Sequence, residues 1–293
     1  MSMKTRFTIL SCLLLLIGCS QEDGQDSAAI MTFDCFNVTV ESPAMTKASI
    51  GIDGTVKWDV GDCIGIYSDS HAPVKYYREE DGKFRGEPIS GTRFYAFYPW
   101  SEDAYNPDKP TELKFCSEQI LWSGNDASIP MVAKSTDENL CFKQTTGILH
   151  FRIKGDKQLI SITLNSKGSA SGEDIFNGTG TIDMDSEQPS LKLDPERSYN
   201  SLSSNCSKEI STAGSWDLYV PVPSYTTFSQ GLELHIEFWR YYEKKKIIKS
   251  TDRNICVERA VMKSFAEIDI EDLLKSEGDK QNNIDDMPIF DEW

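Results

Sequence analysis

Residues 232–239 read LELHIEFW, and this stretch gives the clearest indication of the fold. An apolar residue occupies every second position from Leu232 to Phe238, and the positions between are polar. Successive side chains of a β-strand point to opposite faces of a sheet, so a period of two separates a buried face from a wet face. The stretch therefore predicts a strand with one face in a core.

The same alternation recurs along the chain from residue 31 onward. It is present at residues 36–40, 149–154, 160–164 and 218–222. Turn residues separate these runs, and no long stretch has the spacing of an amphipathic helix. Short strands with turns at intervals of roughly ten residues are typical of antiparallel sandwiches. We therefore predict an all-β fold of two tandem antiparallel β-sandwich domains.

One of these runs contains prolines. Pro221 lies within the strand predicted at residues 218–222, and Pro223 directly follows it. A proline has no N–H to donate to a neighbouring strand. This run is therefore expected at the edge of a sheet or at the end of a strand.

The length of 293 residues favours two domains of ordinary size. We expect an N-terminal domain at 31–137 and a C-terminal domain at 138–273. An acidic tail follows at 274–293, in which Met287, Ile289 and Phe290 are apolar enough to dock on the body of the protein.

The first residues have the pattern of an export signal. A basic start precedes an apolar run at 7–17, followed by Gly18 and Cys19. The run is shorter than the about 20 apolar residues that span a bilayer, and it has the length of a signal-peptide core. The residues before Cys19 also resemble a bacterial lipobox, which implies a lipid on its sulfur. We predict a signal peptide at 1–18 and a tether at 19–30; the alternative is an ordinary secretory signal.

The charge balance argues against some partners. The chain has 46 acidic and 30 basic residues, a formal net charge of −16. Such a charge opposes long-range attraction to nucleic acid, so no nucleic-acid partner is expected. The one basic cluster, Lys244 to Lys246, falls where a hairpin turn is expected.

Motifs of catalysis and metal binding are missing from the sequence. It has no HExxH, GxSxG or GxxxxGK[ST] motif. Asp183 and Asp185 imitate the start of a calcium loop, but Gln188 stands where that loop needs glycine. His150 and His235 fall on the polar side of predicted strands, so we expect them to face solvent. We predict no enzyme, no cofactor and no metal.

The cysteines leave the disulfide question open. Six remain besides Cys12 and Cys19, and none forms a C-x-x-C pair. An even number in an exported chain permits disulfides, whereas strand-like surroundings are typical of small buried hydrophobes. These six are Cys35, Cys63, Cys116, Cys141, Cys206 and Cys256.

Five stretches carry a resemblance to known proteins. They are TKASI at 46–50, WDVGDCIGIY at 58–67, RFYAFYPW at 93–100, ILHFRIKGDKQLISITLNS at 148–166 and LYVPVPSYTTFSQGLELHI at 218–236. In these motifs and in their order along the chain, the sequence resembles the fimbrillin-like lipoproteins of Gram-negative anaerobes. The resemblance implies two transthyretin-like domains in a lipoprotein of the cell outer membrane. Glu22 and Asp23 after the lipobox resemble the family's signal for display on the surface.

The resemblance also implies assembly by strand exchange, in which a trypsin-like protease cuts after a basic residue and removes the first strand. Lys47 matches the cleavage position, and Met31–Val40 would be the strand removed. A strand from another fimbrial subunit would then fill the groove. Many family members have arginine at this position. Pro288 makes the C-terminal tail a poor donor, which favours a tip or accessory subunit.

The alternative is a non-polymerising surface lipoprotein that binds carbohydrate on a host or bacterial surface. Trp239 and Tyr241 lie on the polar side of their predicted strand, where exposed rings are available to stack on sugars. Rings in such positions also cover domain junctions. Cleavage and strand-exchanged oligomers would indicate a subunit, and a full-length chain that binds sugar would indicate a glycan binder.

Overall fold

The computed structural model describes residues 29–41, 49–50, 56–116, 129–168, 174–210, 214–275 and 289–292. Regular structure in these residues is nearly all β-strand, which confirms the all-β prediction, and their one helix is α1 (Ile270–Lys275). None of the helical structure among them is long and apolar enough to cross a membrane.

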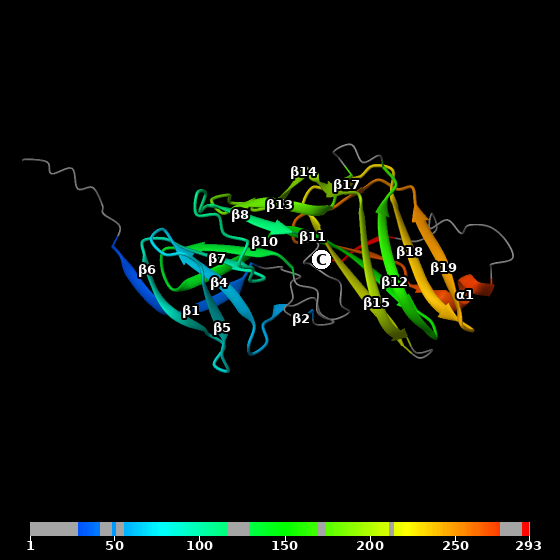
Figure 1. Cartoon of the computed structure of the whole chain (residues 1–293), viewed down its shortest axis with the longest axis horizontal. Helices are drawn as coiled ribbons and strands as arrows, with labels where there is room; N and C mark the ends of the chain where they lie inside the picture. The colour runs from blue at the N-terminus through cyan, green and yellow to red at the C-terminus, as the bar shows by residue number, and fades with distance from the viewer. Residues whose placement is uncertain are drawn as a thin grey trace, which may run out of the picture.

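The N-terminal half is a closed barrel with the strand order β1-β10-β9-β7-β4-β5-β6 (Figure 1). Its strands are β1 (Met31–Val40), β4 (Cys63–Ser68), β5 (Val74–Arg78), β6 (Phe84–Gly91), β7 (Phe94–Tyr98), β9 (Met131–Ser135) and β10 (Asn139–Gln144). Neighbours run antiparallel except β1 and β10, which are parallel. A short hairpin of β2 (Ser49–Ile50) and β3 (Val56–Lys57) precedes β4.

The C-terminal half is a sandwich of two sheets. One sheet has the order β16-β11-β21-β23, with β22 also on β11, and the other has the order β15-β12-β18-β19. The strands are β11 (Thr146–Lys154), β12 (Lys157–Ser166), β15 (Ser201–Ile210), β16 (Ser215–Pro223), β18 (Leu232–Arg240), β19 (Glu243–Thr251), β21 (Met262–Phe265), β22 (Ile268–Asp269) and β23 (Ile289–Glu292). A two-stranded ribbon joins β17 (Thr227–Phe228) to β20 (Ile255–Cys256).

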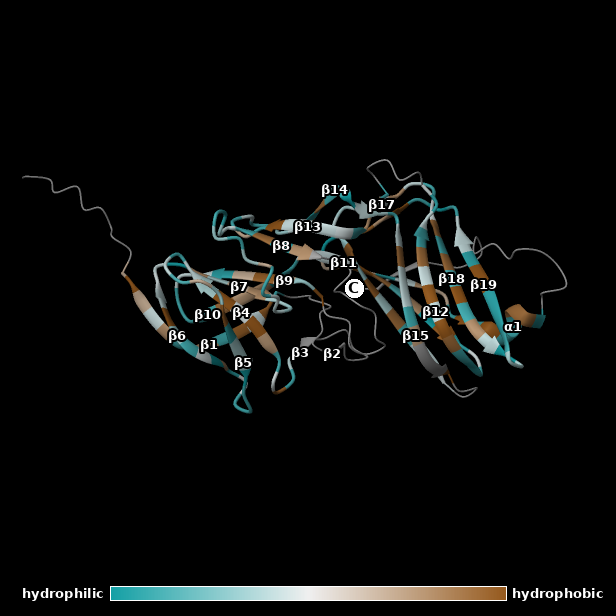
Figure 2. Ribbon diagram, viewed as in Figure 1, coloured by the Kyte–Doolittle hydropathy of each residue, from teal (hydrophilic) through white to brown (hydrophobic). Residues whose placement is uncertain are grey.

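The stretch LELHIEFW forms β18, and its alternation has the expected effect. Leu232, Leu234, Ile236 and Phe238 are buried between the two sheets, where they meet apolar side chains of β11 and β16. Figure 2 shows the resulting bands of hydrophobic and hydrophilic residues on these strands. Full burial of each such side chain contributes about 1.5–3 kcal/mol. The strand with Pro221 and Pro223, β16, lies at a sheet edge as predicted.

A third sheet connects the two halves. It has the order β14-β13-β8, and its strands are β8 (Glu112–Cys116), β13 (Asn177–Asp183) and β14 (Leu191–Tyr199). Leu113 and Ile182 of this sheet pack against the barrel's outward-facing Tyr67 and Phe97 in one apolar cluster. A strand from the N-terminal half thus pairs with a strand from the C-terminal half.

The structure differs from the expected organisation in two respects. The N-terminal half is a closed barrel where an antiparallel sandwich was expected, since strands with the same alternation build either architecture. The barrel also continues to Gln144, past the expected boundary at 137, because β10 pairs with β1 and β9. Alternation identifies the faces of a strand, and it does not identify the strand's partner or direction.

The connecting sheet generates a first prediction. We expect Leu113→Ala to lower the free energy of unfolding by about 2–5 kcal/mol, because it leaves a cavity at a fully buried position. Lys114→Ala is the matched control on the same strand, where the side chain is exposed. Its expected effect is within about 0.5 kcal/mol. Equal losses in urea denaturation of the two variants would contradict the packing described.

Candidate functional site

The predicted assembly site centres on β1. Cys19 and Lys47 lie outside the described residues, one before β1 and the other after it. The strand itself is described in full. The predicted assembly site is therefore described through the contacts that β1 makes in the barrel.

Strand β1 closes the barrel by joining two different neighbours along its length. Residues 31–36 pair antiparallel with β6, whereas residues 37–40 pair parallel with β10. Beyond the strand, the amide of Glu41 still donates to the carbonyl of Phe142 at 2.9 Å. Without β1, the edges of β6 and β10 would both lack a partner along these segments.

Apolar side chains of β1 fill the barrel. Phe36 is completely buried, and Met31, Phe33, Val38 and Val40 pack around the same cluster. A register shift between Phe33 and Cys35 explains why Phe33 and Phe36, three positions apart, both face inward. The alternation from Phe36 to Val40 follows the sequence prediction.

Phe36 lies among other aromatic rings. Its ring centroid is 5.4 Å from that of Tyr76 and 5.6 Å from that of Phe94, both with edge-on geometry. Such pairs contribute about 0.5–1.5 kcal/mol beyond the burial of their area. This one side chain therefore fixes the depth at which β1 sits in the barrel.

A tyrosine hydroxyl ties β1 to the adjacent strand. The Tyr76 hydroxyl donates toward the carbonyl oxygens of Phe33 at 3.1 Å and Glu87 at 2.6 Å. Burial raises the pKa of Tyr76, so the group keeps the proton that it donates. The contact depends on backbone atoms of β1, and a replacing strand of another sequence would supply the same acceptor.

The exit of β1 is held by the C-terminal half. Arg259, between β20 and β21, forms a half-buried ion pair with Glu41, in which Nη2 lies 3.2 Å from Oε2. Arg259 Nη1 also donates to the carbonyl of Gln144 at 3.1 Å. Two-pronged arginine–carboxylate contacts are strong and directional. Glu41 thus fixes the end of β1 next to the predicted cleavage segment.

The second candidate site is the tip of the β18–β19 hairpin. Trp239, Tyr241 and Tyr242 are 40%, 84% and 100% exposed. Together with Gln158 of β12 they line a hollow of about 650 Å³. The structure thus brings the two predicted glycan-contact residues, Trp239 and Tyr241, together with two residues that sequence reasoning did not identify.

The turn of this hairpin has an unusual backbone. Arg240 pairs with Glu243, so Tyr241 and Tyr242 are the two turn residues, with φ values of 50° and 67°. Two-residue turns with both φ values positive favour asparagine and glycine. A side chain in this region costs roughly 1–2 kcal/mol. The backbone conformation of Tyr241 and Tyr242 in this turn therefore destabilises the fold.

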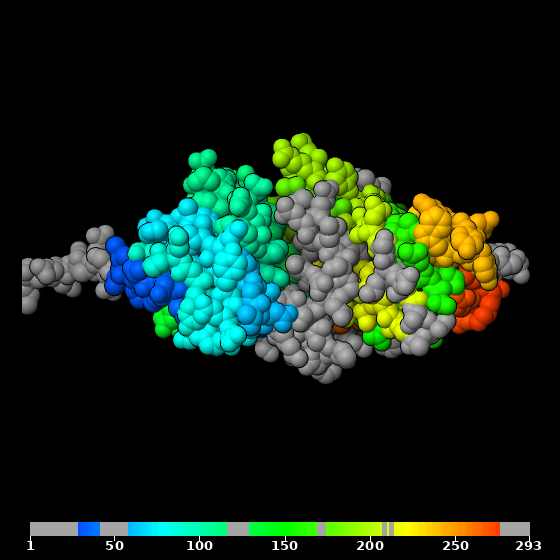
Figure 3. Space-filling view, turned by 60° about the horizontal axis from the view of Figure 1, so that its bottom comes forward, coloured from blue at the N-terminus to red at the C-terminus, as the bar shows by residue number. Residues whose placement is uncertain are grey.

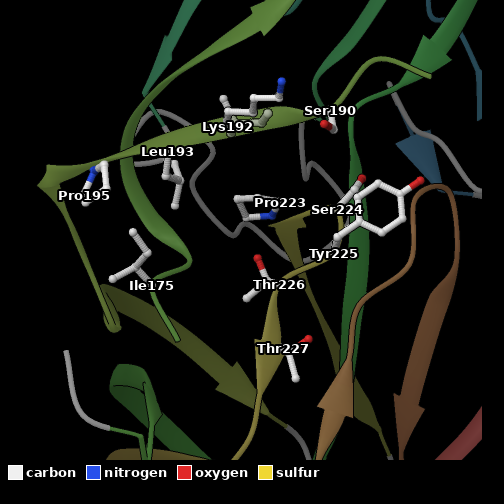
Figure 4. A pocket seen from close by; sticks show the side chains of 11 residues that line it. Ile175, Ser190, Lys192, Leu193, Pro195, Pro223, Ser224, Tyr225, Thr226 and Thr227 are labelled. Carbon is white, nitrogen blue, oxygen red and sulfur yellow. The ribbon is translucent and has the colours of Figure 1, made fainter. Parts of the chain in front are cut away.

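A further cavity of about 630 Å³ lies between β14 and the end of β16 (Figure 4). Leu193, Pro195 and Pro223 give it apolar walls, and hydroxyls of Ser224 and Thr226 also line it. Its lining comes from segments far apart in the sequence. For that reason, no local sequence motif predicts this cavity.

His150 differs from its prediction. It is only 8% exposed, although a solvent-facing position was expected. Its Nε2 lies 2.8 Å from Asp217 Oδ1 and its Nδ1 lies 3.0 Å from Ser264 Oγ, so it joins β11, β16 and β21. The ring also stacks on Tyr219 at 4.6 Å. At His150, the face of the β11 sheet that points away from the sandwich core is therefore also covered. The alternation within a single strand does not show whether its polar face is covered by other segments.

The five cysteines with described side chains, Cys35, Cys63, Cys141, Cys206 and Cys256, are all free thiols. The side chain of Cys116 is outside the description. Among the described residues no group of histidine, cysteine and carboxylate side chains is arranged to hold a metal ion.

Comparison with known proteins gives loose structural similarity. No family model matches the chain, and no curated protein is similar in sequence. A candidate cell adhesion protein from Bacteroides fragilis aligns over 79% of this chain and 93% of its own, with 9% identity and a TM-score of 0.39. One from Bacteroides eggerthii aligns over 83% and 86%, with 11% identity and a TM-score of 0.38.

A fimbrial protein from Bacteroides ovatus aligns over 80% of this chain and 50% of its own, with 10% identity and a TM-score of 0.34. These scores are low, so the proposals below rest on the residues of this chain.

The contacts of the Phe36 ring are expected to stabilise the fold. We expect Phe36→Ala to lower the free energy of unfolding by about 3–5 kcal/mol, because it leaves a cavity at a completely buried position. Asp34→Ala, at an exposed position of the same strand, is the control and is expected to change it by about 0.5 kcal/mol or less. A small effect of Phe36→Ala in equilibrium denaturation would show that β1 does not depend on this contact.

The His150 network yields a pH prediction. Burial alone would raise the pKa of Asp217, but hydrogen bonds from Arg152 and His150 outweigh it and lower the pKa. A lowered pKa in the fold stabilises the protein above the unfolded value of about 3.9 and ceases to do so as the pH falls through the folded value. Asp217→Asn should therefore reduce stability most above about pH 4.

The measurement is the unfolding free energy of the wild type and the variant between neutral and acidic pH. The difference between them should shrink on acidification. Glu80→Gln, at an exposed turn position, is the control. A difference for Asp217→Asn that stays constant with pH would contradict the assignment.

Proposed function

We propose that the protein is a cell-surface fimbrial subunit, at the tip or in an accessory position, that assembles by strand exchange and serves adhesion. In this proposal a lipid on Cys19 anchors the new chain to the outer membrane. Cleavage after Lys47 then releases the body together with an open groove in the barrel. The partners are other fimbrial subunits, and no catalytic role is assigned.

The proposal rests on the way in which β1 is held in the barrel. It is the first strand of the barrel, and it is held by backbone pairs with β6 and β10 and by inward apolar side chains. A single cut in the segment between Glu41 and β2 would separate it covalently from the body. The vacated groove would then offer backbone groups to another strand, which is the chemistry of β-strand addition.

The position of the C-terminal strand supports a tip or accessory role. Residues 289–292 form β23, which pairs antiparallel with β21 of the same chain. As expected, the end of the tail docks on the body. A tail engaged at its own sheet edge, with Pro288 just before the strand, is a poor donor for a neighbour. A subunit that accepts a strand and donates none ends a fibre.

The cleavage step has a direct test. Mass spectrometry of the protein on its native cells should find a mature N-terminus at Ala48. In cells that carry Lys47→Ala, the chain should instead begin at a lipid-modified Cys19. Lys83→Ala, at an exposed turn of the barrel, is the matched control and should be processed like the wild type.

An acylated wild-type chain that begins at Cys19 and stays monomeric would overturn the proposal. It would favour the alternative, a non-polymerising surface lipoprotein that binds carbohydrate. The exposed rings at the β18–β19 tip are the observation in favour of that second candidate.

A further inference from the structure

The tip of the β18–β19 hairpin has the opposite charge to the rest of the protein. Residues 239–246 carry four basic side chains and one acidic one, whereas the chain as a whole has 46 acidic and 30 basic residues. Lys244 and Lys246 are exposed, and Lys245 pairs with Glu243 at 2.9 Å. A basic spot on an acidic protein attracts an anion locally while the body repels anions.

The basic groups are placed against the aromatic rings. Lys244 Nζ lies 5.6 Å from the centroid of the Trp239 ring, and the guanidinium of Arg240 lies 5.6 Å from that of Tyr241. Lys244, Trp239 and Gln158 occupy one row across three strands. The hollow therefore presents ring surfaces and a side-chain amide, and the two basic groups lie against two of the rings that line it.

This combination matches one class of ligand. A sugar ring offers C–H groups that pack on aromatic faces and hydroxyls that pair with an amide. A carboxylate on that sugar would pair with the lysine or the arginine. A flat anionic membrane would also meet rings and cations, but it would not use the hollow between Gln158 and the tyrosines.

The residues of the hairpin turn favour a binding role for this tip. Tyr241 and Tyr242 occupy turn positions that asparagine and glycine fill without strain, and both rings point into solvent. The tip also lies at the far end of the molecule from the start of β1 (Figure 1), and Figure 3 shows the chain around β19 at that end of the surface. A site there would face away from an anchor attached before β1.

We propose that the hollow lined by Gln158, Trp239, Tyr241 and Tyr242 binds an acidic glycan, with Lys244 and Arg240 contacting its carboxylate. The site is independent of the strand exchange proposed above. It operates in the intact and in the cleaved chain, so its failure and the failure of that proposal are distinguishable.

The test is calorimetric titration of the wild-type protein with sialyllactose and with trigalacturonate, beside lactose as a neutral sugar. At least one acidic sugar should bind, and lactose should bind more than about tenfold more weakly. Trp239→Ala and the double change Tyr241→Asn with Tyr242→Gly should each weaken binding by more than about tenfold. Tyr199→Ser, at another exposed tyrosine, should leave it unchanged.

The double change also separates binding from folding. Asparagine followed by glycine suits the turn, so the melting temperature of this variant should stay equal or rise while binding is lost. Absence of binding to both acidic sugars would overturn the proposal, and so would equal binding of lactose. Binding only to phosphatidylglycerol vesicles would overturn it as well and would identify a membrane contact.

Discussion

Closure of the N-terminal barrel by β1 is the constraint on which the rest of the structure depends. A sheet edge left open exposes unpaired backbone groups, and a barrel avoids this only when its last strand is in place. Here that strand comes first in the chain, and it pairs with β6 along one half and β10 along the other. The buried ring of Phe36 and the ion pair of Glu41 with Arg259 hold it at the centre and at the exit. The same strand that completes the fold is the one that the proposed assembly replaces.

Part of this architecture could be predicted from local sequence. The alternation in LELHIEFW identified a strand with its core face, and the prolines of β16 identified a sheet edge. The pairing of β10 with β1 was not predictable in this way, because parallel partners leave no local turn signal. His150 was misjudged for a related reason. Its face of the sheet is covered near Tyr219 by a second small core of Ile129, Ile148 and Met262, contributed by distant segments.

The candidate sites, too, could be predicted from local sequence only in part. Trp239 and Tyr241 were singled out because their alternation with apolar neighbours faces them outward. Gln158 joins them only through the pairing of β12 with β18, and the strained turn at Tyr242 is visible only in the backbone. The proposed acceptor groove and the proposed glycan site lie in different halves, joined by the sheet of β8, β13 and β14. A subunit could thus be assembled at one end and bind at the other.

Peptide exchange tests most directly whether β1 is replaceable once it is cut from the body. A fluorescent peptide of residues 31–41 would be incubated with intact protein and with protein cleaved after Lys47, and each mixture would be separated by size. The peptide should co-elute with the cleaved protein and not with the intact one, because only a severed β1 vacates its groove. No incorporation into the cleaved protein, or equal incorporation into both, would contradict it.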